Sequence, residues 1–169
     1  ITSGAGPVPL ASGPQFVVHI LPLESFSIPQ PRLDLSALTR DYEPIKPIYW
    51  HLHGERRNLD GVIGRAQADK DGTVPSYVQA FHNGSFEGVV VGLHNETNTG
   101  VKILMDKVAE QRIIDFVSRV RRFLADHEIA HPILIGISVF GVKGYKIWPS
   151  RRNMFFEEPR HDIDRDTLI

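Results

Sequence analysis

Hydrophobic and polar residues alternate along both arms of the segment at residues 76–92, and this pattern predicts a β-hairpin. Asn83 and Gly84 lie between the arms. An Asn-Gly pair suits a two-residue type I′ turn, which needs positive φ at both central positions. With that turn, Phe81 faces Phe86, and both faces of the hairpin carry apolar side chains. We therefore expect the hairpin at the centre of its sheet.

One face of the hairpin predicted in this way is aromatic, because Tyr77, Phe81 and Phe86 fall on the same side. Aromatic side chains on adjacent strands form stacking platforms in some proteins that bind single-stranded RNA. The chain has no RNP-like sequence, and such residues are more often part of a core. We expect this face to pack against a helix.

A helical repeat of apolar residues follows the hairpin, from about residue 107 to residue 127. Charged and polar residues lie on the opposite side of the same segment, so the pattern predicts one long amphipathic helix. The apolar stripe contains Val108, Ile113, Phe116, Val117, Val120, Phe123 and Leu124.

Apolar runs at residues 16–21, 62–66 and 133–140 predict further strands. We expect residues 145–148 to form a hairpin with the last of these runs, because glycines lie between them. The proline-rich stretch 22–47 excludes regular sheet and predicts a long loop. Together these elements predict an α+β fold, in which one long amphipathic helix packs on a face of an antiparallel or mixed β-sheet.

The ends of the chain differ in composition from its middle. Residues 1–14 are rich in glycine and proline and predict a linker, residues 15–148 predict a single α+β domain, and residues 149–169 predict a charged C-terminal extension. The first residue is isoleucine where a natural start would be methionine. We therefore expect the chain to be part of a longer protein.

Composition excludes several classes of function. The chain of 169 residues has 19 basic and 20 acidic residues, so nothing in its overall charge favours nucleic acid or an acidic membrane. It has no cysteine, which removes disulfides and thiol catalysis and suits a reducing compartment. There is no signal peptide or apolar span either. We expect a cytoplasmic protein without a membrane partner or a cofactor.

His51 and His53 form an H-x-H pair, which on a strand would place both imidazoles on one face, where they could bind one metal ion. A catalytic zinc site needs a further ligand or base, and Glu55, Asp60 and His82 are the candidates. None of them has a recognised spacing, and H-E-x-x-H is absent. The alternative is a pair of surface histidines.

The segment that follows offers two guanidinium groups, an amide and a carboxylate, on Arg56, Arg57, Asn58 and Asp60. Arginine binds phosphate or carboxylate through two parallel hydrogen bonds, so this segment is a candidate site for an anionic ligand. Asn and Asp before Gly also favour a tight turn. In that alternative the polar groups bond to the backbone and the arginines are solvated.

A basic stretch near the end of the chain is a candidate nucleic-acid interface, because basic and aromatic residues suit a phosphate backbone with occasional base stacking. Acidic residues from Glu157 onwards weaken its field. The candidate residues are Lys143, Tyr145, Lys146, Arg151 and Arg152.

Several motifs together resemble a known family: VVHILPLESFS, N-L-D-G at residues 58–61, SYVQAFHNGSFEGV and HPILIGISVFGVKGYKI. They are similar to the C-terminal region of bacterial Schlafen-like proteins, which carry an N-terminal AlbA-type domain and are described as DNA-binding or ATP-binding. The resemblance extends from about Phe16 to Ile147. Leu59 departs from the aromatic residue expected before Asp-Gly.

The resemblance implies a downstream domain whose partner is the missing N-terminal part of its parent protein, and no catalytic residue carries over. We therefore expect a non-catalytic accessory domain with a sensor, regulatory or oligomerisation role, and self-association is one expected partnership. Two alternatives remain: a metal-dependent hydrolase that uses His51 and His53, and a nucleic-acid-binding module that uses the stretch from Lys143 to Arg152.

Overall fold

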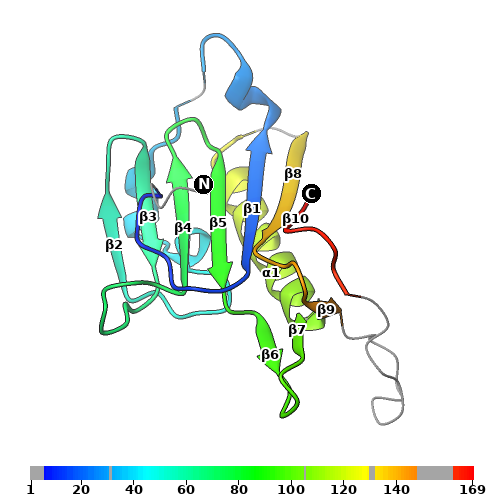
Figure 1. The fold of residues 1–169 in the computed structure, drawn as a ribbon. Helices are drawn as coiled ribbons and strands as arrows, with labels where there is room; N and C mark the ends of the chain where they lie inside the picture. The colour runs from blue at the N-terminus through cyan, green and yellow to red at the C-terminus, as the bar shows by residue number, and fades with distance from the viewer. Residues whose placement is uncertain (1–5, 31, 105, 130–131, 148–161) are drawn as a thin grey trace.

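The computed structural model describes residues 6–30, 32–104, 106–129, 132–147 and 162–169. It confirms an α+β fold, in which a seven-stranded antiparallel sheet lies against one long helix (Figure 1). The strands follow the order β10 (Thr167–Leu168), β8 (Ile133–Phe140), β1 (Gln15–Pro22), β5 (Phe86–Val91), β4 (Ser76–Phe81), β3 (Gly61–Arg65) and β2 (Gly54–Arg57).

The helix α1 (Asp106–Asp126) forms where the apolar stripe predicts it, and it crosses behind the sheet in Figure 1. Phe116, Val120 and Phe123 of the stripe are buried in the main core. Gly88 on β5 lets the helix come close, because a Cβ atom there would lie 2.7 Å from the Phe116 ring and 2.8 Å from Ile48. A side chain at position 88 would therefore clash with residues that pack on this face of the sheet.

Within its described residues, the proline-rich stretch forms no regular sheet beyond Pro22, and it contains three 3₁₀ turns: η1 (Leu23–Phe26), η2 (Leu35–Thr39) and η3 (Glu43–Ile45). Leu35, Leu38 and Ile45 are buried in the same core as α1. The Asp34 side chain caps η2 by accepting from the Ser36 backbone N–H at 2.9 Å. The turns and the helix thus share the covering of one face of the sheet.

The hairpin is present at the centre of the sheet, but the predicted register is wrong by one residue. Ala80 pairs with Phe86, and Phe81 closes the loop by donating to Ser85 O at 2.9 Å, so three residues turn the chain instead of two. Gly84 alone supplies the positive φ, at 83°. Because a shift of one residue moves a strand's side chains to the other face, the facing residues change.

The corrected register separates the predicted aromatic face. Phe86 does pack under the helix, with its ring 6.1 Å from that of Phe123 in an edge-to-face arrangement. Tyr77 lies on the opposite face, in a second cluster with Val17 and Val89. The prediction that Tyr77 and Phe86 meet the helix together is therefore wrong.

That opposite face is partly covered by residues 6–14. Val8 is buried in the second cluster, and Leu10 forms a bridge with Val74. Arg56 also donates to the carbonyl of Pro7 at 2.8 Å. At the other end of the chain, residues 167–168 pair with Phe140 and Val139 of β8. Parts of both terminal segments thus lie on the domain.

A smaller sheet contains β6 (His94–Glu96), β7 (Lys102–Leu104) and β9 (Lys146–Ile147). The expected hairpin between residues 133–140 and 145–148 is wrong, because β9 pairs in parallel with β7. Gly141 and Gly144 both adopt positive φ between β8 and β9, which turns the chain away from the main sheet.

Candidate functional site

The H-x-H pair lies in a loop rather than on a strand, because β2 begins only at Gly54. His51 and His53 are both exposed, and the backbone N–H of His53 donates to Arg65 O at 3.0 Å. Among the described residues, no three His, Asp or Glu side chains gather as metal ligands would. The described geometry therefore adds no third ligand to this pair.

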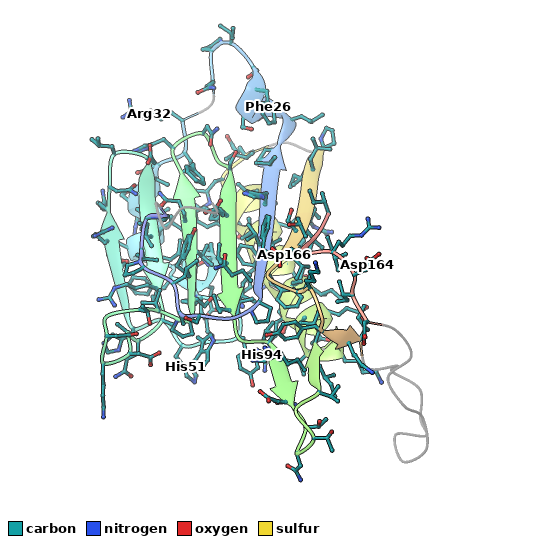
Figure 2. The ribbon with its side chains drawn as sticks, in the orientation of Figure 1. Phe26, Arg32, His51, His94, Asp164 and Asp166 are labelled. Atoms are coloured by element: carbon teal, nitrogen blue, oxygen red, sulfur yellow. The ribbon has the colours of Figure 1, made fainter. Side chains whose placement is uncertain are left out.

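The two histidines do line a hollow of about 730 Å³ at one end of the sheet. His51 is labelled at this end in Figure 2. The walls of the hollow come from the segment before β2, the loop between β3 and β4, the N-terminal residues 11–12 and the end of β5. A hollow of this size is within the range that holds small ligands, about 300 to 1,000 Å³.

Arg56 and Arg57 end strand β2, and residues 58–60 form the tight turn between β2 and β3. The side-chain oxygen of Asn58 accepts from the backbone N–H groups of Asp60, at 3.1 Å, and Gly61, at 2.8 Å. The same amide exchanges hydrogen bonds with Gln79. Asn58 is thus occupied by structural bonds.

The two arginines of this segment differ in their surroundings. Arg56 is bonded to the carbonyl of Pro7, while Arg57 and Asp60 are exposed. Because Arg56 and Arg57 are consecutive on β2, their side chains point to opposite faces of the sheet. The two guanidiniums therefore do not form one clamp around an anion.

The basic stretch is described as far as Ile147, so Arg151 and Arg152 lie outside the described residues. Tyr145 is buried, with its ring edge-to-face against His94, so the ring is not open to a base. Lys146 pairs with Asp162 at 3.5 Å, and Lys143 is exposed. Strand β9 belongs to the smaller sheet and lies on the β8 side of the molecule in Figure 1, whereas β2 is the opposite edge of the main sheet.

The sequence analysis missed a titratable cluster on the face without the helix. Glu87 accepts from the Tyr77 hydroxyl at 2.7 Å, and its other oxygen lies 2.9 Å from Nε2 of His19. Burial tends to raise the pKa of Glu87, but the bonds to His19 and Tyr77 outweigh it and hold that pKa below its ordinary value. Burial, with the bond to Glu87, raises the pKa of the Tyr77 phenol.

The signal that would have found this cluster was the hairpin register. In the observed pairing, Glu87 lies opposite both His19 and Gln79. In the register with a two-residue turn, Glu87 falls on the face opposite Tyr77. Because the predicted register is wrong by one residue, it places Glu87 and Tyr77 on different faces and does not predict the cluster.

The outer edge of β8 is a further feature that the sequence analysis did not single out. Among the described residues, none pairs with this edge between Ile133 and Ser138, because β10 reaches only Val139 and Phe140. Leu134, Ile135 and Ile137 are exposed there by 52%, 50% and 43%. Ile133 and Ile135 line a groove of about 450 Å³ together with Ile20, Val117 and Arg121.

Comparison of the chain with protein-family models, with curated proteins and with solved structures finds no match. Within the described part of the chain, no helix is long and apolar enough to span a membrane.

Proposed function

We propose that this chain is a non-catalytic accessory domain that associates with a second copy of itself through the free edge of β8. The resemblance to the C-terminal region of bacterial Schlafen-like proteins supports a place in a larger cytoplasmic protein with a sensor or regulatory role. The observation that carries the proposal is the exposed apolar edge between Ile133 and Ser138.

An open strand edge offers unpaired backbone N–H and C=O groups, and proteins normally shorten, charge or cover such edges. The free part of β8 has none of these protections within the described residues. It reads Ile-Leu-Ile-Gly-Ile-Ser, without a charge or a proline. Adding a strand from another chain would satisfy the backbone groups and bury the apolar side chains.

The sequence of this edge is suited to pairing with itself. Ile133, Ile135 and Ile137 pair with Pro22, Ile20 and Val18 of β1, so all three lie on the helix-facing side. They are also placed symmetrically about Ile135. An antiparallel pair centred on Ile135 would put Ile133 of one copy opposite Ile137 of the other, on the same face, and cross-strand β-branched pairs stabilise sheets.

Charges at the two ends of the edge are complementary in that arrangement. Arg121 lines the groove beside Ile133 and is exposed, and Asp166 is exposed next to β10 at the Phe140 end. Antiparallel pairing places the basic end of one copy near the acidic end of the other. The charge distribution therefore favours this antiparallel pair over a parallel pair, in which like charges would meet.

Sedimentation equilibrium of the purified chain tests the proposal. We expect a dimer, and we expect Ile135→Lys to give a monomer, because two lysines would meet at the centre of the paired edge. The matched control is Leu59→Lys, which adds the same charge at a residue 97% exposed in the turn between β2 and β3.

The control should remain a dimer, and circular dichroism should show that both variants are folded. Wild-type protein that is monomeric at all concentrations contradicts the proposal. A dimer that survives in folded Ile135→Lys protein contradicts the use of this edge.

A further inference from the structure

The hollow at the end of the sheet has a mixed lining that suits one class of ligand. Apolar contacts come from Leu52, Pro75 and Val91, and polar groups come from His51, His53 and Lys70. Trp50 also lines it and remains 42% exposed. An exposed indole at the rim of a hollow is available for stacking, which a buried core tryptophan is not.

The residue before Trp50 has a strained backbone conformation. Tyr49 adopts a φ of 71°, a left-handed conformation that is unusual for a residue with a large side chain. Such strain persists only where surrounding contacts impose it, and it is concentrated at functional sites. Here the Tyr49 ring contacts the Trp50 ring edge-to-face, with centroids 5.7 Å apart.

The helix supports the same arrangement from the other side. The guanidinium carbon of Arg112 on α1 lies 5.1 Å from the centroid of the Tyr49 ring, a cation–π contact. Arg112, Tyr49 and Trp50 therefore form a chain of contacts from the helix to the hollow. Tyr49 thus contacts both the helix and Trp50, while its own side chain remains 46% exposed.

The polar lining is mainly cationic or hydrogen-bond donating. Lys70 and the two imidazoles can donate to an anionic group, and Asp69 is the only acid among the described lining residues. An aromatic platform next to such donors fits a flat ring that carries a negative charge. Neither the aromatic platform nor the donors alone would indicate a ligand that has both a flat ring and a negative charge.

We propose that this hollow binds a small ligand that combines a planar aromatic ring with an anionic group, with the ring stacked on Trp50 and the anion near Lys70, His51 and His53. The site is separate from the β8 edge and uses other strands and loops. It would supply the sensor role without any change to the assembly surface.

Isothermal titration with adenosine monophosphate and with indole-3-acetate tests this proposal, because both probes join a planar ring to an anion. We expect at least one of them to bind, and we expect Trp50→Leu to weaken that binding about tenfold, in line with the loss of one aromatic stacking contact. Uncharged adenosine and inorganic phosphate should each bind more weakly than adenosine monophosphate where the nucleotide is the probe that binds.

The control is Phe26→Leu, which removes another exposed aromatic ring at the opposite end of the sheet (Figure 2). This variant should bind the probes as the wild type does. Absence of saturable binding for both probes overturns the proposal. So does binding that folded Trp50→Leu protein retains in full, because the stacking surface would then play no part.

Discussion

The protonation state of the Glu87 carboxylate depends on its burial and on its contacts with Tyr77 and His19. Its side chain is only 14% exposed, yet it accepts from Tyr77 and contacts His19. Removing a carboxylate from water disfavours its ionised form, whereas hydrogen bonds to that form favour it. The net lowering of its pKa means that the ionised form stabilises the fold.

We predict that Glu87→Gln makes the free energy of unfolding less dependent on pH in the acid range. A carboxyl with a folded-state pKa below its unfolded value stabilises the protein above the unfolded value. That contribution is lost as the pH falls through the folded value. The pH range in which this contribution is lost therefore lies below the ordinary glutamate pKa of 4.5. Urea unfolding at a series of pH values measures the effect.

The control for this prediction is Glu55→Gln, which removes an exposed carboxylate from β2. Its acid dependence should follow that of the wild type. At neutral pH, Glu87→Gln should also be less stable by about 1 kcal/mol, the usual net contribution of a hydrogen bond. Parallel pH profiles for wild type and Glu87→Gln would contradict the role given to this carboxylate.

The helix α1 packs on the sheet over Gly88, which has no side chain. Gly88 on β5 faces the Phe116 ring and Ile48, both of which are fully buried. A methyl group there would come within 3 Å of both, and neither neighbour is on the surface. Glycine normally weakens a strand, so its presence here reflects the close approach of α1.

We predict that Gly88→Ala destabilises the domain by about 2 kcal/mol, the middle of the range for overpacked cores. The matched control is Gly54→Ala on β2, where a Cβ atom would lie 3.9 Å from its nearest neighbour, the Arg65 guanidinium. That variant should change stability little. Thermal unfolding of both variants gives the comparison, and equal melting temperatures would contradict this account of the packing.

Long periodic segments could be predicted from the sequence because their pattern averages over many residues. The stripe of α1 and the alternation in β4 and β5 are examples, and all three elements form where expected. The length of the loop between β4 and β5 could not be predicted from the sequence. Asn-Gly fits a two-residue turn, and it also fits a three-residue loop in which Gly84 alone has positive φ. Only the register distinguishes the two.

The candidate sites depended on contacts between distant segments, which local pattern does not encode. Asn58 bonds to Gln79, and Lys146 meets Asp162. That part of β8 has an open edge within the described ranges is known only from the strand order, because a central strand and an edge strand share the same apolar sequence pattern. Asn58 forms the turn bonds that the sequence offered as one alternative, whereas ligand binding by this segment stays a prediction.

Across the whole molecule, the sheet has two differently covered faces. The helix and the 3₁₀ turns bury one face over a large cluster. The other face is covered in part by residues 6–14, where the Val74 backbone donates to Pro9 O at 2.9 Å and accepts from the Ala11 N–H at 3.0 Å. The hollow lies at the end of this second face, and Ala11 and Ser12 contribute to its wall.

Whether the N-terminal segment stabilises the domain is a question about the molecule as a whole, and Val8 provides the test. Val8 is 8% exposed in the cluster with Tyr77 and Val89, so Val8→Asp would place a charge in an apolar environment. We predict a loss of about 2 kcal/mol in the free energy of unfolding, comparable to the burial of one valine side chain. Ser12→Asp, at an exposed position of the same segment, should have little effect.

Urea unfolding measures both variants, and limited proteolysis reports on the segment itself, because a detached segment is cleaved faster than the folded domain. We expect Val8→Asp to increase cleavage within residues 6–14, and Ser12→Asp to leave it unchanged. If the two variants have equal stability and equal cleavage, the segment acts as a linker that only rests on the sheet. A difference between them makes it part of the folded unit, and the wall of the hollow is then held by the same contacts that stabilise the second face.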